Sequence, residues 1–129
     1  MQPQQFDLIK PTEENHYCVF SSDLEHDPKI FFHVTQAINF NKIIKSGFQS
    51  AKQLGVGVLE SVSYARHSSS CLAHLGCEVD ENLVIFAVCF TEEQLKHVTC
   101  NPSDIHVHKK KIQPTIVGYV CIPEGYLII

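Results

Sequence analysis

The chain has 129 residues, a formal net charge of −4, 44% apolar residues and 19% charged residues. This length fits one domain, and the balance is that of an ordinary globular protein, which excludes wholesale disorder and a fibrous architecture. The longest apolar run, residues 83–90, is well short of the roughly 20 residues that span a bilayer. The N-terminus shows no basic and then apolar signal pattern, so we expect an intracellular protein, cytoplasmic or nuclear, with no membrane partner.

Acidic residues gather near the N-terminus, where six of the fourteen precede Lys29. With three prolines in the same stretch, we expect residues 1–29 to form an acidic arm or cap and residues 30–129 to form the domain proper. The asymmetry argues against a surface that coats nucleic acid, although a nucleic-acid partner stays open. The one basic block, residues 109–111, is typical of a solvated turn.

The first half of the chain alternates between strand and helix signals. Residues 17–20 predict a short strand and residues 30–34 a stronger, β-rich one. Apolar residues then recur at helical spacing between Asn39, a suitable N-cap, and Gly47, a suitable C-terminal residue. The order expected here is strand, short helix, turn.

The middle of the chain predicts a glycine-spaced strand, a helix and a long buried strand. The strand covers residues 55–59, and Ser61 or Ser63 then opens a helix that Gly76 ends. Residues 83–90 form the long buried strand because they are apolar throughout.

The last third predicts one helix and several strands. Residues 91–94 fit a capping box, and residues 101–104 break the chain. Strands follow over residues 105–108, 115–122 and 126–129. Because strands outnumber helices without strict alternation, the sequence favours a mixed α+β fold over a doubly wound parallel sheet.

One segment has the character of a binding site. His33 lies two residues before Thr35, at the end of a buried strand and ahead of a capped helix. Polar side chains at the end of an element are accessible to a ligand. The plainer alternative is a structural histidine beside a capping threonine.

This segment resembles the first motif of the ADP-ribosyltransferase superfamily, in its diphtheria-toxin and poly(ADP-ribose) polymerase branch. In that family the first strand carries His-x-Ser/Thr and leads into a helix that ends in Gly-Phe or Gly-Leu. In this chain His33 and Thr35 match the strand motif, and Gly47-Phe48 match the end of the helix. Residues 55–59 resemble the second motif. The closing strands of the family resemble residues 112–117 and 123–128.

The resemblance covers roughly residues 30–129. It implies an ADP-ribosyltransferase-like α+β fold of two small, mostly antiparallel sheets with short flanking helices. It also implies NAD as the substrate and a macromolecular acceptor, most simply a protein, for mono-ADP-ribosyl transfer.

The resemblance assigns roles around NAD to a defined group of residues. His33 would bond the ribose, the Val34 backbone would meet the nicotinamide amide, and Tyr64 would stack on nicotinamide. The residues that the resemblance places around NAD are His33, Val34, Thr35, Gly57, Ser61, Ser63 and Tyr64.

The third motif departs from the family pattern. Where the family has an acid that stabilises positive charge on the ribose, this chain has Gln113. The carboxylates nearest in sequence are Glu60, beside the second motif, and Glu124, in the turn after the strand. Two functions follow: a transferase with His33, Tyr64 and Gln113 as its catalytic residues, or a catalytically inactive interaction module of the same fold.

A third hypothesis concerns the segment Cys71-x2-His74-x2-Cys77, with His67 upstream. Thiolate and imidazole suit tetrahedral zinc, but a structural site needs four ligands, so we expect buried thiols and no bound metal. Cys71 beside His67 or His74 is also the one local pairing that fits nucleophilic cysteine chemistry. Most other thiols lie in apolar runs and are expected to be reduced.

Overall fold

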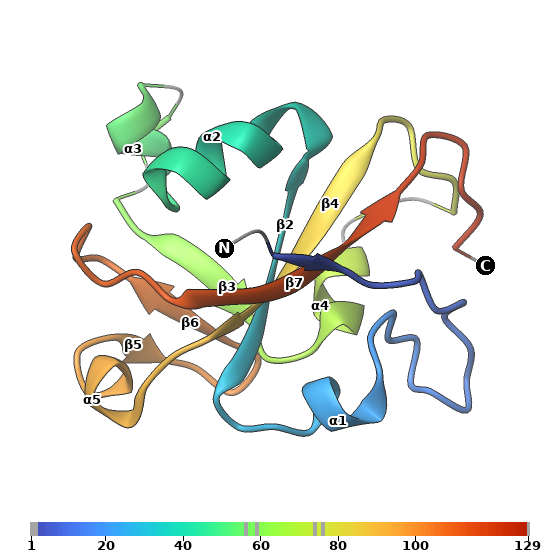
Figure 1. Cartoon of the computed structure of the whole chain (residues 1–129), viewed down its shortest axis with the longest axis horizontal. Coiled ribbons are helices and arrows are strands. Elements are labelled where there is room, and N and C mark those ends of the chain that lie inside the picture. Colours follow the sequence, from blue (N-terminus) through green and yellow to red (C-terminus); the bar gives the residue numbers. More distant parts are fainter. Residues whose placement is uncertain (1–2, 56, 59, 74, 76, 129) are drawn as a thin grey trace.

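The computed structural model describes residues 3–55, 57–58, 60–73, 75 and 77–128. Over these residues the chain is an α+β structure with one seven-stranded sheet and short helices (Figure 1). The strands are β1 (Gln4–Gln5), β2 (Ile30–Gln36), β3 (Val62–Ala65), β4 (Leu83–Cys89), β5 (Thr99–Cys100), β6 (Asp104–Val107) and β7 (Thr115–Ile122). The helices are α1 (Ser22–Glu25), the 3-10 helix η1 (Ala37–Asn39), α2 (Phe40–Ser46), α3 (Ala51–Leu54), α4 (Ser68–Leu72) and α5 (Glu92–Leu95).

The strand order across the sheet is β1-β7-β4-β2-β3-β6-β5. Neighbouring strands are antiparallel except β1, which runs parallel to β7. Strand β4, between β7 and β2, is apolar without interruption and is buried on both faces of the sheet. Leu83, Ile85 and Ala87 enter one core, and the alternate residues Val84, Phe86 and Val88 enter the other.

Different parts of the chain cover the two faces. The first face carries α1, α4 and the N-terminal segment, whose Phe20 ring lies 4.9 Å from that of Phe32. The second carries α2 and Phe48, whose ring meets Phe86 edge-on with centroids 5.5 Å apart. The acidic segment expected as an arm or cap therefore supplies part of the core, and its strand β1 joins the sheet beside β7 (Figure 1).

Several predicted elements are confirmed because their signals are local. The predicted strands over residues 30–34, 83–90 and 115–122 correspond to β2, β4 and β7, and that over residues 105–108 to β6. The helix between Asn39 and Gly47 is α2, and Gly47 follows it at φ 80°, where a glycine carries no steric penalty. The capping box is present: Thr91 Oγ1 accepts from the Gln94 peptide N–H, and the Gln94 side chain accepts from the Thr91 peptide N–H.

The helix predicted to open at Ser61 or Ser63 is wrong, since this stretch is strand β3. Val62 and Tyr64 are buried while Ser63 between them is exposed, which is the two-residue period of a strand. β3 pairs along its whole length with β6, and that long-range partner decides the conformation. Helix α4 begins only at Ser68.

Other predicted elements are shorter or absent. Residues 17–20 form no strand, although three of them are buried, and the terminal segment 126–128 makes only one bridge, Leu127 with Glu78. Of the predicted strand 55–59, the described residues 55, 57 and 58 lie outside any strand. Its residues 56 and 59, like Gly76 and residue 129, lie outside the described residues.

The sheet is nearly divided between β2 and β3. These strands pair at one position, Phe32 with Ala65, whereas β2 pairs with β4 over all seven of its residues. The two separate sheets that the resemblance implied are therefore replaced, over the described residues, by one sheet with a narrow join. Beyond this one pair, residues 33–36 of β2 and residues 62–64 of β3 do not pair with each other. We call this unpaired region between the two strands the fork.

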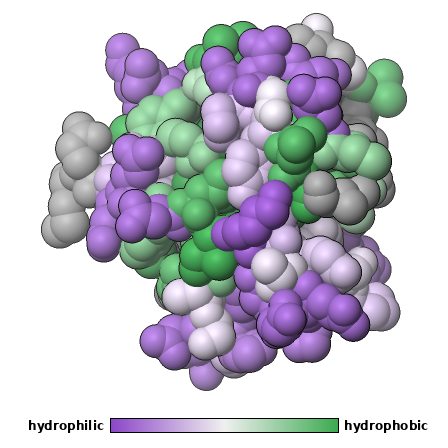
Figure 2. Space-filling view, turned by 90° about the vertical axis from the view of Figure 1, so that its right-hand side faces the viewer, coloured by the Kyte–Doolittle hydropathy of each residue, from purple (hydrophilic) through white to green (hydrophobic). Residues whose placement is uncertain are grey.

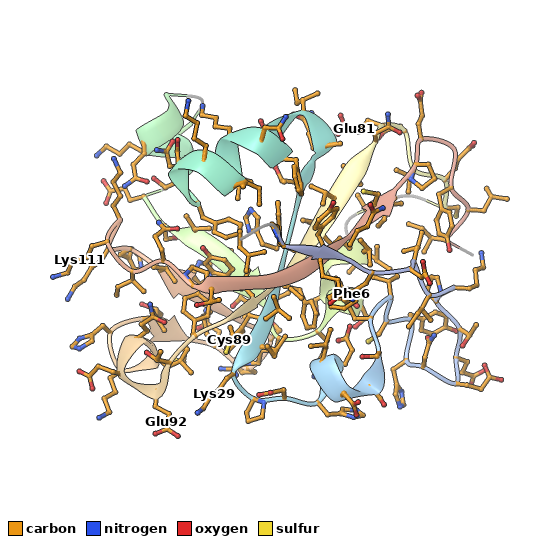
Figure 3. All side chains as sticks on the ribbon, in the orientation of Figure 1. Phe6, Lys29, Glu81, Cys89, Glu92 and Lys111 are labelled. Carbon is orange, nitrogen blue, oxygen red and sulfur yellow. The ribbon has the colours of Figure 1, made fainter. Side chains whose placement is uncertain are left out.

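Gly118 offers a test of how the N-terminal segment is held. A Cβ at this position would overlap the Phe6 ring and approach the Gln4 carbonyl oxygen, because β1 lies directly against β7 there (Figure 3 labels Phe6). We expect Gly118→Ala to destabilise the fold by about 1–3 kcal/mol. Urea unfolding measures the loss, and amide exchange should show that the Phe6 N–H, bonded to the Tyr119 carbonyl, loses protection.

The matched control is Thr115→Ala, an exposed position on the same strand. If Gly118→Ala left both the stability and the Phe6 amide protection at wild-type values, the close packing of β1 on β7 would be refuted.

Candidate functional site

His33 lies in the fork between β2 and β3. Its Nδ1 is 2.8 Å from the Ser63 carbonyl oxygen, and its ring packs against Phe48 and Tyr64 with centroids 5.2 and 5.4 Å away. A carbonyl oxygen only accepts hydrogen bonds, so Nδ1 carries the hydrogen. Burial lowers the pKa of His33, and the bond to Ser63 opposes that shift. The ring is thus favoured as the neutral Nδ1–H tautomer, with Nε2 as an acceptor for a hydroxyl group.

Val34 and Thr35 follow His33 along the strand. Thr35 Oγ1 accepts from Asn39 Nδ2 at 3.0 Å, which ties the end of β2 to the following helical turn. The Val34 backbone partly opposes the raised pKa of the buried Cys71 thiol in α4.

Tyr64 is a core residue with 1% of its surface exposed. Its ring meets Phe90 and Phe48 edge-on, with centroids 5.0 and 5.4 Å away. Burial raises the pKa of its hydroxyl far above the usual range. A ligand could stack on this ring only after its aromatic neighbours had moved, so the expected stacking role does not fit this packing.

Gln113 binds the backbone of a distant segment. Its Oε1 accepts from the Phe48 peptide N–H, and its Nε2 donates to the Phe48 carbonyl, each at 2.9 Å. Nε2 also donates to the Lys110 carbonyl at 2.9 Å. One N–H donor of the amide therefore holds Phe48, the residue that packs on His33, and the other holds the Lys110 carbonyl. This arrangement requires an amide and assigns Gln113 a structural role.

Ser63 and Tyr64 lie on opposite faces of β3, because successive strand residues alternate. They therefore do not line one NAD pocket together, as we expected when this stretch was predicted to be a helix. Ser63 Oγ instead lies 2.9 Å from His106 Nδ1, and Ser61 Oγ lies 3.4 Å from the same atom. His106 Nε2 is 3.3 Å from Asp104 Oδ2. Sequence reasoning missed this serine–histidine–aspartate chain, because its register depends on the pairing of β3 with β6.

The remaining predicted positions lie apart from His33 in their contacts. Gly57 is exposed and outside any strand. Glu60 forms an exposed ion pair with Lys52, with 2.7 Å between Oε1 and Nζ. Glu124 is exposed in the turn after β7, where its peptide N–H donates to Asn82 Oδ1. Neither carboxylate shows a contact that supplies the acid missing from the third motif.

Cys71 is a buried thiol of α4. Burial, with smaller contributions from Glu25 and Cys18, raises its pKa to about 12. A reactive thiol needs a lowered pKa and access, so the nucleophile hypothesis does not fit this site. No group of three or more potential metal ligands comes together among the described residues. The zinc hypothesis also includes His74, which lies outside them.

Two large hollows lie elsewhere on the surface. One, of about 550 Å³, lies beside α2 and the start of β7, with Ile43, Ile44 and Ile116 in its wall. The other, of about 470 Å³, lies between α1 and the segment before it, with Cys18, Glu25 and His67 in its wall. Figure 2 views the molecule from the right-hand side of Figure 1 and shows hydrophobic and hydrophilic side chains intermixed on that side.

Comparison of the chain with protein-family models, with curated proteins and with solved structures found no match. Within the part of the chain that the structure describes, no helix has the length and apolar character needed to cross a membrane.

The structural role of Gln113 can be tested by Gln113→Glu. The carboxylate loses both N–H donors and faces the carbonyl oxygens of Phe48 and Lys110, so we expect a loss of roughly 1–3 kcal/mol at pH 7. Urea unfolding measures it. Gln5→Glu, an exposed change of the same charge, is the control. Equal stability of Gln113→Glu and wild type would show that these bonds contribute nothing.

The burial of Cys71 predicts its reactivity. At pH 7.5 a disulfide reagent should modify the exposed Cys77 and Cys100 in the folded protein. Cys71 should react only after unfolding, because burial shields its thiol and raises its pKa. Peptide mass spectrometry identifies the labelled positions. Labelling of Cys71 as fast as that of Cys100 would revive the nucleophile hypothesis.

Proposed function

We propose that this chain is an ADP-ribosyltransferase-like module that has lost transferase activity and serves as a protein-interaction domain. The fold part of the proposal is supported by the presence of His33-Val34-Thr35 in the second half of β2 and of Gly47-Phe48 directly after α2, in the order of the family's first motif. The narrow join between β2 and β3, with the histidine in the fork, is in keeping with a ligand cleft at that place in an ancestral enzyme.

The loss of activity rests chiefly on Gln113. A carboxylate near the developing ribosyl cation favours transfer, because negative charge stabilises the cation most in the transition state. Gln113 carries no charge, and its amide is engaged with Phe48 and Lys110. Tyr64 adds to the argument, because its ring is enclosed by Phe48, Phe90 and His33 instead of facing a nicotinamide pocket.

Binding of NAD or an ADP-ribose compound without turnover is the second candidate function. His33 favours it, because its fixed tautomer leaves Nε2 as an acceptor that suits a ribose hydroxyl. Thr35, two residues further along β2, would supply a further hydroxyl group near the fork. In this second candidate function the chain binds NAD or an ADP-ribose compound and does not transfer ADP-ribose.

Two measurements test the proposal. Incubation with millimolar NAD should release no nicotinamide above a buffer blank. Thermal unfolding should shift with neither NAD, ADP-ribose nor nicotinamide, whereas a ligand at 100 times its dissociation constant would add about 2.7 kcal/mol.

His33→Ala is the control variant. Nicotinamide release that disappears in this variant would overturn the loss of activity. A thermal shift with NAD or ADP-ribose that disappears in it, without any release, would establish the second candidate in place of the first.

A further inference from the structure

A second site lies on the opposite face of the sheet from Tyr64, at the N-terminal cap. The hollow of about 470 Å³ there is formed by the segment before α1, by α1 itself and by the start of α4. Its volume lies in the range of ligand pockets. Phe20 and Cys18 give it apolar wall, and Glu14, Glu25 and His67 give it polar groups.

The described lining of this pocket includes the carboxylates of Glu14 and Glu25, the imidazoles of His16, His26 and His67, and no lysine or arginine. Wherever these imidazoles are uncharged, the charge of the pocket is negative. Burial raises the pKa of the Cys18 thiol, and the nearby Glu25 carboxylate raises that pKa further. A positively charged group is the ligand that these walls complement.

Glu25 is a buried, hydrogen-bonded residue in the wall of the pocket. Only 4% of the residue is exposed, and its carboxylate accepts from the Ser68 peptide N–H at 3.1 Å and from the Ser68 hydroxyl. His67 Nδ1 lies 3.4 Å from Oε1. Ser68 Oγ in turn accepts from the Val19 peptide N–H at 2.9 Å. The cap segment, α1 and α4 are thus joined through one buried carboxylate.

The rim of the pocket is held in an unusual backbone conformation. His16 and Tyr17 have φ of 57° and 62°, a left-handed region that non-glycine residues seldom adopt. Asn15 supports the turn: its side chain accepts from the Thr12 peptide N–H at 2.8 Å and donates to the Lys10 carbonyl at 2.9 Å. The rim is therefore organised before any ligand binds, which reduces the entropy that binding would cost.

An adjoining hollow of about 240 Å³ shares the wall formed by Glu25, His26 and His67 and adds Asp27 and Arg66. The Arg66 side chain donates to the Asn101 carbonyl and lies over the Phe31 ring. A ligand longer than one side chain has room to continue into it, past a further carboxylate.

We propose that this pocket receives a lysine or arginine side chain from a basic segment of a partner protein. The apolar wall takes the aliphatic stem, and the charged end lies towards Glu14 and Glu25. The adjoining hollow takes the flanking residues of the segment. This inference rests on the proposed interaction function and names its partner class, but it concerns a different face of the sheet from His33.

The test uses a nonapeptide of Gly, Ser and three Lys residues, blocked at both ends, and its counterpart with every lysine acetylated. Amide shifts of the full chain are followed by NMR at pH 8, where histidine is ordinarily uncharged. We expect the lysine peptide to shift amides around the pocket, such as those of Asn15, Cys18 and Ser69, and the acetylated peptide to bind at least tenfold more weakly.

Glu14→Gln and Glu13→Gln are the matched variants, since both positions are exposed and adjacent but only Glu14 lines the pocket. We expect Glu14→Gln to weaken binding about threefold, the size of one exposed charge pair, and Glu13→Gln to weaken it less. Melting curves of both variants check that they remain folded.

Three results would overturn the inference: no binding of the lysine peptide, equal binding of the acetylated peptide, or equal weakening by the two variants, which would indicate a diffuse acidic surface. Butylammonium is the small-molecule probe, and its binding at the pocket without binding of the peptide would also overturn the protein-partner assignment. Nicotinamide release in the NAD test would contradict the proposed function and leave this peptide result unaffected, so the two failures are distinguishable.

Discussion

The burial of β4 on both faces is the constraint on which the rest of the structure depends. A seven-residue strand that is apolar throughout cannot leave either face in water, so each face must be covered by something. The chain covers one face with its acidic N-terminal segment, α1 and α4, and the other with α2, Phe48 and the residues around α5. The N-terminal segment is therefore structural, although its composition is that of a solvated arm.

The join between β2 and β3 determines what the face near His33 can do. Because the strands pair only through Phe32 and Ala65, the Ser63 carbonyl is available to His33 Nδ1. The histidine is thereby oriented, and the aromatic rings of Phe48 and Tyr64 pack against it. The same packing leaves only 1% of Tyr64 exposed. The fork therefore combines one oriented group, His33, with a buried aromatic ring.

The opposite face of the sheet carries the carboxylates of Glu25 and Glu14 at the N-terminal cap. Glu25 is buried with Ser68 and His67 around it, and Glu14 stands at the rim of the same hollow. Buried carboxylates are costly unless hydrogen-bond donors surround them, and here those donors come from Ser68, 43 positions along the chain. Folding of the cap and formation of the acidic pocket are thus one event.

The sequence by itself determined the elements whose signals are local: the uninterrupted apolar strand β4, strands β2 and β7, the glycine after α2 and the capping box of α5. It also placed His33 and Thr35 in one strand, although β2 continues to Gln36 and His33 lies at its middle. Tertiary structure alone decided that Val62–Ala65 is a strand, since four residues are too few to separate the two periods until β6 pairs with them. It alone decided that Gln113 holds Phe48, 65 positions away, and that Glu25 meets Ser68. Hydrogen bonds and burial of this kind join residues that no sequence period relates, which is why the candidate site could be listed residue by residue but not assembled before the fold was known.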